Sequence, residues 1–228
     1  MSGPPPAASA PPRGLQRLLT EPRRPEPIRN SPQAPWFVVA AVCIGAFMGQ
    51  LDASIVTLAF PTLRHAFGAP LADVQWVGQA YLLVPIGLLT AVGRYADMLG
   101  RKLLYTYGFV IFILGSALCG AAPSLPALIG FRVFQGVGAA MPQANSVAII
   151  ASAVPPGRLG RAIGVQGAAQ ALGLALGPAV GGLLITLGGW RLVFLVNVPM
   201  GVLGTVLAWL LIPRSRHLAA RRPFDWPG

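Results

Sequence analysis

The chain has 228 residues, of which 54% are hydrophobic and only 10% are charged, and its mean hydropathy is +0.65. A soluble domain carries about 25% charged residues, so this composition excludes an ordinary water-soluble protein and favours one surrounded by membrane lipid. The net charge of +11 does not indicate nucleic-acid binding, because the basic residues fall in short gaps between apolar segments and form no single patch.

The first 35 residues have a composition of their own, with ten prolines and five arginines. They contain no apolar stretch long enough for the core of a signal peptide. We therefore predict that residues 1–35 form a disordered tail, not a cleaved targeting signal.

Six apolar segments follow, and each is long enough to cross a bilayer. A spanning helix needs about 20 apolar residues, because the hydrocarbon core is about 30 Å thick and each residue rises about 1.5 Å. The pattern predicts an all-α membrane protein with six transmembrane helices. These segments are 36–60, 73–96, 102–122, 125–152, 161–187 and 190–213.

The basic residues predict the orientation of these helices. Of the 17 Lys and Arg residues, five precede the first segment, three lie in or beside the gap between the second and third, two lie around the fourth gap, and four follow the sixth. Alternating spans put all of these on one side, whereas only Arg64 and Arg191 lie on the other. Because basic loops stay in the cytoplasm, we expect both termini there.

Two ionisable residues, Asp52 and Arg132, lie well inside the predicted spans. A charge in mid-membrane costs at least about 2.5 kcal/mol, so such residues usually face a cavity or a partner. Asp52 lies about 12 Å and Arg132 about 10 Å from the outer ends of their helices, which places them at one level. We expect them to face a common cavity, where Arg132 would favour the charged carboxylate and burial would oppose it. The carboxylate could then load and release a proton; the alternative is a static structural ion pair.

Polar side chains also recur at helical spacing in the fourth and fifth segments. They are expected either to line a substrate path or to form hydrogen bonds between helices, and the sequence leaves both readings open. Asn197, in the sixth segment, is expected to form an interhelical hydrogen bond. The candidate cavity residues are Gln135, Gln143, Gln166 and Gln170.

Small residues dominate one face of the fifth segment. Gly173, Gly177 and Gly181 repeat every four residues, and Pro178 removes one backbone donor and favours a bend. This face is expected to pack closely against another helix. It either packs statically or slides and bends as the protein changes conformation.

The gap between the second and third segments reads GRYADMLGRK from residue 93 to residue 102. Its two glycines permit close helix approach and a tight turn, and Asp97 can pair with Arg101. The stretch resembles the signature loop of the major facilitator superfamily, although Tyr95 and Met98 replace a leucine and a basic residue. The resemblance implies that a latch holds the cytoplasmic side closed. Its residues are Gly93, Asp97, Gly100, Arg101 and Lys102.

Four further stretches resemble motifs of the drug:proton antiporter-2 family of that superfamily, in the same order: 51–61, 132–140, 173–182 and 190–201. The resemblance implies the N-terminal bundle of a fourteen-helix exporter in the bacterial inner membrane. It also implies a small amphipathic substrate, a proton as coupling ion, and no cofactor or metal. Residues 214–228 would be a cytoplasmic basic segment leading to a missing seventh helix. The partner would then be the missing C-terminal half or a second copy.

Other functions remain as alternatives or are excluded. A solute importer of the same superfamily and a truncated, non-transporting fragment remain possible readings. A membrane enzyme is disfavoured, because His65 and His217 have no partner at catalytic spacing. The two cysteines, Cys43 and Cys119, lie in apolar runs and are expected to be core residues.

Overall fold

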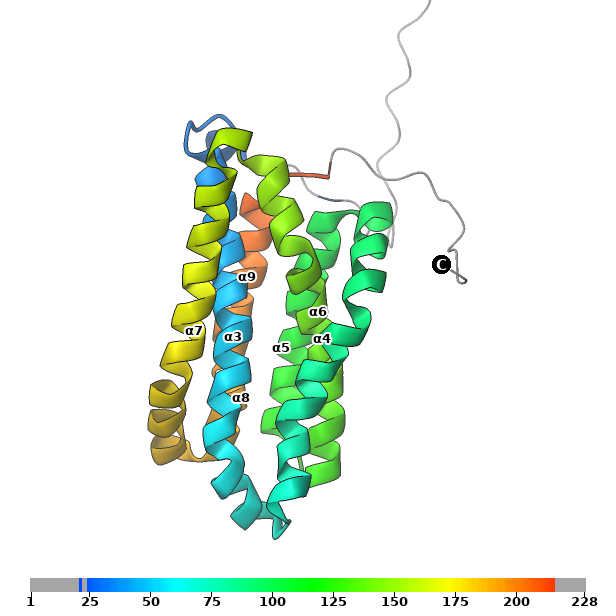
Figure 1. The fold of residues 1–228 in the computed structure, drawn as a ribbon, viewed down its shortest axis with the longest axis vertical. Coiled ribbons are helices and arrows are strands. Elements are labelled where there is room, and N and C mark those ends of the chain that lie inside the picture. Colours follow the sequence, from blue (N-terminus) through cyan, green and yellow to red (C-terminus); the bar gives the residue numbers. More distant parts are fainter. Residues whose placement is uncertain (1–20, 22–23, 216–228) are drawn as a thin grey trace, which may run out of the picture.

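The computed structural model describes Glu21 and residues 24–215 as a bundle of long helices that run side by side (Figure 1). No strand occurs among these described residues, so the expected all-α class is confirmed. The helices are α2 (Glu26–Arg29), α3 (Ala34–Phe67), α4 (Leu71–Leu99), α5 (Arg101–Gly120), α6 (Leu125–Ala153), the 3-10 turn η1 (Pro156–Arg158), α7 (Leu159–Gly188), α8 (Trp190–Leu195) and α9 (Asn197–Leu211).

Within the described residues, five helical segments are long and apolar enough to cross a membrane. They are α3, α4, α5, the segment from η1 through α7, and the segment from α8 through α9. Helix α6 has 29 residues but is not among them, because it carries polar side chains that include Arg132 and Gln135. The predicted number of six spans is therefore not confirmed by hydropathy, although α6 is long enough to cross.

Helix α3 differs from its predicted segment in an informative way. Helix α3 continues through Pro61 to Phe67, although the segment was expected to end at residue 60. Tertiary packing supports the extra turns, since Leu63 is fully buried and the Phe67 ring centroid lies 5.4 Å from that of Trp190. Gly68 then ends the helix with a positive φ of 60°, which a glycine adopts without strain.

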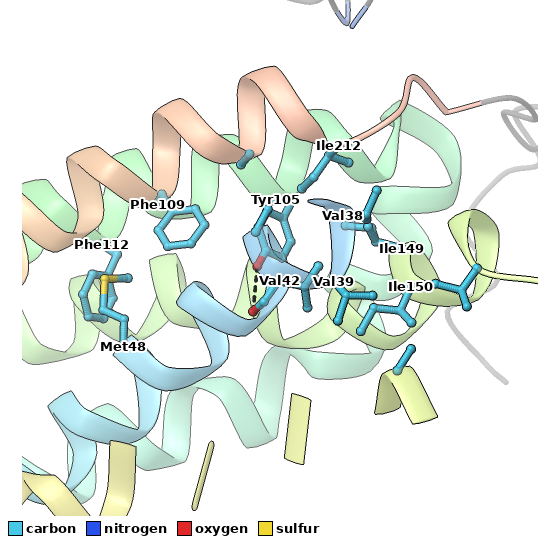
Figure 2. Packing of buried hydrophobic residues seen from close by; sticks show 14 of the residues in the cluster. Val38, Val39, Val42, Met48, Tyr105, Phe109, Phe112, Ile149, Ile150 and Ile212 are labelled. Carbon is cyan, nitrogen blue, oxygen red and sulfur yellow. Dashed lines mark hydrogen bonds between the residues drawn. The ribbon is translucent and has the colours of Figure 1, made fainter. Parts of the chain in front are cut away.

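The helices are arranged in two groups, and α3 and α9 of one group contact α6 and α5 of the other. Helix α3 packs along α7, while α4 and α5 pack against α6, and α9 contacts both α3 and α5. Figure 1 shows α3, α7 and α9 on one side of the bundle and α4, α5 and α6 on the other. A buried apolar cluster fills the space between α3, α5, α6 and α9, and the Tyr105 hydroxyl donates a hydrogen bond to the Val42 carbonyl at 3.5 Å there (Figure 2).

The outside of the bundle is apolar, whereas several polar groups are buried inside it. Leu83 on α4 is 55% exposed and Leu187 on α7 is 70% exposed, whereas Asp52 and Arg132 have no exposed surface. This distribution is opposite to that of a water-soluble bundle. It fits a protein whose outer surface contacts lipid.

The connections between helices lie alternately at the two ends of the bundle, as the charge pattern predicts. The start of α3, the α4–α5 turn, the α6–α7 connection and the end of α9 lie together at the top of Figure 1, and the other turns lie at the bottom. The predicted disordered tail differs in its described part: residues 26–29 form α2, and Glu21 is buried and hydrogen-bonded. Residues 1–20, 22–23 and 216–228 lie outside the described residues.

Candidate functional site

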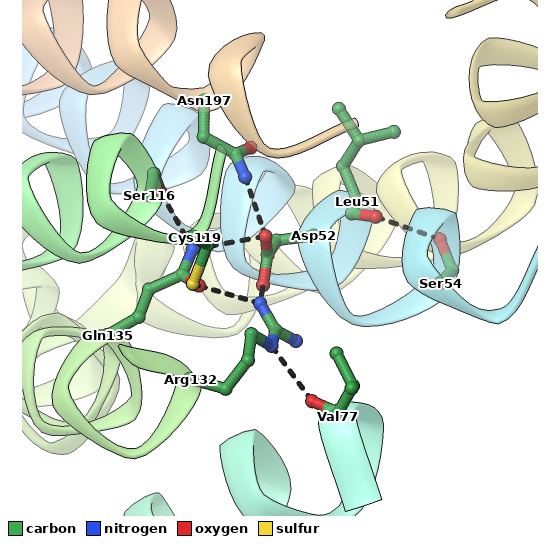
Figure 3. Close-up of polar contacts among 9 residues, drawn as sticks. All are labelled: Leu51, Asp52, Ser54, Val77, Ser116, Cys119, Arg132, Gln135 and Asn197. Carbon is green, nitrogen blue, oxygen red and sulfur yellow. Dashed lines mark hydrogen bonds and ion pairs between the residues drawn. The ribbon is translucent and has the colours of Figure 1, made fainter. Parts of the chain in front are cut away.

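The two charged residues inside the bundle form a buried ion pair. Asp52 of α3 and Arg132 of α6 are both fully buried, and Arg132 Nη1 lies 2.7 Å from Asp52 Oδ2 (Figure 3). Their equal predicted depth is therefore realised as a direct contact. Such a pair requires further hydrogen bonds, because two charges removed from water lose their hydration.

Amide side chains from two helices supply these further bonds. Asp52 Oδ1 accepts hydrogen bonds from Asn197 Nδ2 of α9 at 2.6 Å and from Gln135 Nε2 of α6 at 3.1 Å. Gln135 Oε1 accepts a second bond from Arg132 Nη1 at 2.7 Å, and Gln135 Nε2 also lies 2.7 Å from the hydroxyl of Ser116 on α5. We call Asp52, Ser116, Arg132, Gln135 and Asn197 the polar cluster; it joins α3, α5, α6 and α9 (Figure 3).

Helix α4 completes the environment of the arginine. Arg132 Nε donates to the Val77 carbonyl at 3.0 Å, and the guanidinium carbon lies 4.0 Å from the centre of the Tyr81 ring. The Phe194 ring lies on another side, at 5.6 Å. Aromatic faces attract a desolvated cation. Arg132 Nη2 has no hydrogen-bond partner among the described residues.

Local sequence explains how two of the cluster residues reach their positions. Pro199 lacks the N–H that would bond to the carbonyl four residues earlier, and the sixth span is broken at Val196. Asn197 is the first residue of α9, and its side-chain amide donates to the Asp52 carboxylate. On α5, Gly115 lies against the backbone of Gln135, so α5 and α6 approach closely enough for Ser116 to meet that amide.

A cavity of about 320 Å³ lies next to the polar cluster and is lined by residues of α3, α4, α5, α6 and α7. Asp52 and Arg132 do not line it, so the expectation that they face a common cavity is wrong for this conformation. The physical reason is that the polar cluster gives both carboxylate oxygens of Asp52, and Nη1 of Arg132, partners that water would otherwise provide. Tyr81 connects the two sites, because it lines the cavity and its ring covers the guanidinium of Arg132.

The four candidate glutamines separate into different environments. Gln143 and Gln170 line the cavity, together with Gln50, which the sequence reasoning missed. Gln135 instead belongs to the polar cluster and does not line the cavity. Gln166 is buried away from it, and its Oε1 has no hydrogen-bond partner in the described part of the chain. A substrate role for Gln143 and Gln170 stays a prediction.

The signature loop forms the turn between α4 and α5. Asp97 and Arg101 are paired as expected, with 2.8 Å between Oδ1 and Nη2, and Gly100 has a φ of 112° that disfavours other residues. Lys102 is almost fully buried. The expected close approach at Gly93 is absent within the described residues, since no atom lies within 4 Å of where its Cβ would be. The latch role of the loop stays a prediction.

The glycine face of α7 packs against α3. A Cβ at Gly173 would collide with the Phe47 carbonyl, and one at Gly177 would collide with the Ser54 hydroxyl. The Ser54 hydroxyl also lies 3.4 Å from the Gly173 carbonyl and donates to it. Gly181 lies against Ile55, and Pro178 lies inside the helix. The face is therefore a close helix contact, and its sliding stays a prediction.

Comparison with known proteins identifies the relatives of this chain. The sequence profile described as Major Facilitator Superfamily matches residues 42–226. The riboflavin transporter RibZ of Clostridioides difficile (strain 630) is 37% identical over 193 residues, which are 85% of this chain and 42% of that protein. The tetracenomycin C resistance and export protein of Streptomyces glaucescens is 36% identical over 195 residues, which are 85% of this chain and 36% of that protein.

Solved structures with a similar fold also match this chain. The crystal structure of a bacterial homolog to the human lysosomal transporter Spinster, in an inward-facing and unoccupied conformation, matches with a TM-score of 0.71 and 23% identity. The match covers 87% of this chain and 48% of that one. The chain thus spans about two-fifths of the two curated relatives and about half of the solved structure.

Proposed function

The chain belongs to the major facilitator superfamily, and from this membership we propose that it forms the N-terminal half of a proton-coupled exporter of drugs or amphipathic organic metabolites. The activity would be that of a whole protein in which a second half, or a second copy, closes the substrate path. The basic end of the bundle would face the cytoplasm.

The observation that carries the proposal is the buried pair of Asp52 and Arg132. Charged residues inside a membrane are costly and mark ion pathways or proton relays. Protonation of Asp52 would remove its charge and weaken its attraction to Arg132, while Arg132 would keep Gln135 and the Val77 carbonyl as acceptors. Because the polar cluster joins α3, α5, α6 and α9, this change would loosen contacts between helices that must move when access alternates.

The lining of the cavity of about 320 Å³ supports the proposal of an amphipathic substrate. None of its described lining residues is charged; they combine aromatic rings such as Phe109 and Phe112 with the amides of Gln50, Gln143 and Gln170. Rings would contact the apolar part of a substrate and amides would form hydrogen bonds with its polar atoms. The two relatives, a riboflavin transporter and a tetracenomycin C resistance and export protein, agree with an organic substrate of this kind.

Reconstitution with a pH-sensitive dye tests the proton role. The whole transporter carrying Asp52→Asn would be placed in vesicles, and proton release would be recorded when riboflavin or a fluorescent amphipathic dye is added. We expect substrate-driven proton release to be lost in Asp52→Asn and kept in the matched variant Asp73→Asn, whose carboxylate is exposed at the start of α4. Unchanged coupling in Asp52→Asn would overturn the proton role and leave a static ion pair. Reconstitution of the 228-residue chain by itself tests the alternative, because absence of transport there would favour a non-transporting fragment.

A further inference from the structure

A second cavity, of about 490 Å³, lies at the end of the bundle that carries the basic connections. It is enclosed by the first residues of α3, the α4–α5 turn, the last turns of α6, and the segment after α9. Four basic residues line it: Arg24, Arg101, Lys102 and Arg214. It shares no residue with the polar cluster or with the first cavity, of about 320 Å³.

Among the described residues, two acidic groups lie at this cavity against the four basic ones. Asp97 lines the cavity and is paired with Arg101. Glu21 lies beside it, buried, and accepts hydrogen bonds from the Ser215 hydroxyl at 2.8 Å, the Ser215 backbone N–H at 2.5 Å and the Leu103 backbone N–H at 3.4 Å. Positive charge therefore exceeds negative charge, and both carboxylates already have partners.

Arg24 shows where the excess charge lacks a partner. Its Nε and Nη2 atoms are buried, and neither has a hydrogen-bond partner among the residues that the structure describes. A buried guanidinium donor without an acceptor is costly. Burial also lowers the pKa of Arg24, because removal from water disfavours the charged form. The planar guanidinium is suited to two oxygens of a phosphate or carboxylate group.

The cavity lining also includes apolar residues. Pro35, Ile149, Ala153, Ile212 and Pro213 contribute to it, at the ends of helices that continue into the membrane. A lining that combines cationic and apolar side chains fits a phosphate group attached to an apolar body better than it fits a free, fully hydrated anion. Basic pockets between helices on the cytoplasmic side are known to hold anionic lipid head groups.

We propose that this cavity binds a phosphate-type anion, held by Arg24 and Arg214 beside the start of α5. The phosphate belongs either to a lipid head group or to a soluble phosphate compound. Its binding would tie the segment before α3 and the segment after α9 to the α4–α5 turn. The proposal does not depend on proton coupling or on the identity of the transported substrate.

Lipid nanodiscs test the proposal with the whole transporter. Binding of phosphatidylglycerol would be compared with that of phosphatidylcholine by native mass spectrometry, and inorganic phosphate and glycerol phosphate would be added as competitors. Each arginine near a membrane surface contributes roughly 1 kcal/mol to attraction for anionic lipid, so Arg24→Gln with Arg214→Gln should weaken phosphatidylglycerol binding by about tenfold to thirtyfold. Arg158→Gln is the matched control, since Arg158 is exposed at the same end but outside the cavity.

The outcomes separate the two sources of phosphate. Preference for phosphatidylglycerol without competition by the soluble anions supports a lipid head group, and arginine-dependent binding of the soluble anions supports a soluble ligand. Equal binding of the two lipids together with no binding of the soluble anions overturns the proposal, as does an equal loss in Arg158→Gln. Because Arg24 is partly buried and its substitution could disturb packing, Arg214→Gln alone, at an exposed side chain, must also weaken binding.

Discussion

Substitution of the ion pair, singly and together, tests whether Asp52 and Arg132 act as one unit in the folded protein. Arg132 Nη1 and Asp52 Oδ2 are 2.7 Å apart, and two unit charges at that distance attract by about 6 kcal/mol at an effective dielectric of about 20. Desolvation offsets much of this attraction, so the pair itself adds little net stability. Removing one partner is different, because it leaves a buried charge without compensation and costs about 3–5 kcal/mol.

The structure also predicts which single substitution is worse. In Asp52→Asn the arginine keeps Gln135, the Val77 carbonyl and the Tyr81 ring, and asparagine still offers one acceptor oxygen. In Arg132→Gln the carboxylate keeps only two amide donors, from Asn197 and Gln135. We therefore expect Arg132→Gln to lower the free energy of unfolding by about 3–5 kcal/mol, and Asp52→Asn to lower it by less.

The double variant completes the cycle. With both charges removed, we expect stability to recover by at least about 1 kcal/mol relative to Arg132→Gln, since residues in one hydrogen-bonded network couple by about 0.5–3 kcal/mol. The measurement is the free energy of unfolding of the whole transporter during a denaturing-detergent titration in mixed micelles. Strictly additive losses in the double variant would refute the reasoning, because they would mean that the two charges do not stabilise each other.

Two further predictions concern packing and orientation. Gly177→Ala should lower the free energy of unfolding by about 1–3 kcal/mol, because the added Cβ would collide with the Ser54 hydroxyl. Gly182→Ala is the control and should be neutral or slightly stabilising, because no neighbouring helix lies within 4 Å of its Cβ position. Equal effects of the two substitutions in the same titration would contradict the close contact of α7 with α3. In a background without native cysteines, an impermeant maleimide should label Arg158→Cys only in inverted vesicles and Arg64→Cys only in intact cells. The reverse labelling would contradict the proposed orientation.

Local sequence was sufficient for much of this architecture. Hydropathy and segment length indicate the helices, because lipid requires each backbone polar group to bond within its own segment. Asp52 and Arg132 stand out for the same reason, since charges are rare in such segments. Their equal depth followed from the rise per residue alone, and the structure pairs them.

Other features required the tertiary structure. Gln135 and Gln143 lie eight residues apart on α6, yet one bonds inside the polar cluster and the other lines the cavity. Ser116 gave no signal in the sequence, because its role depends on the close approach of α5 and α6 at Gly115. The contact between Glu21 and Ser215 joins residues 194 positions apart.

The sequence by itself determined which segments are helices, which end of the bundle is basic and which side chains are too polar for lipid. Only the tertiary structure decided which of those side chains meet, that the Asp52 carboxylate is closed off from the cavity, and that cations gather around Arg24. The physical reason is that hydropathy and helical period act along one helix. The partners of a side chain depend instead on how each helix is rotated and how closely it crosses its neighbours.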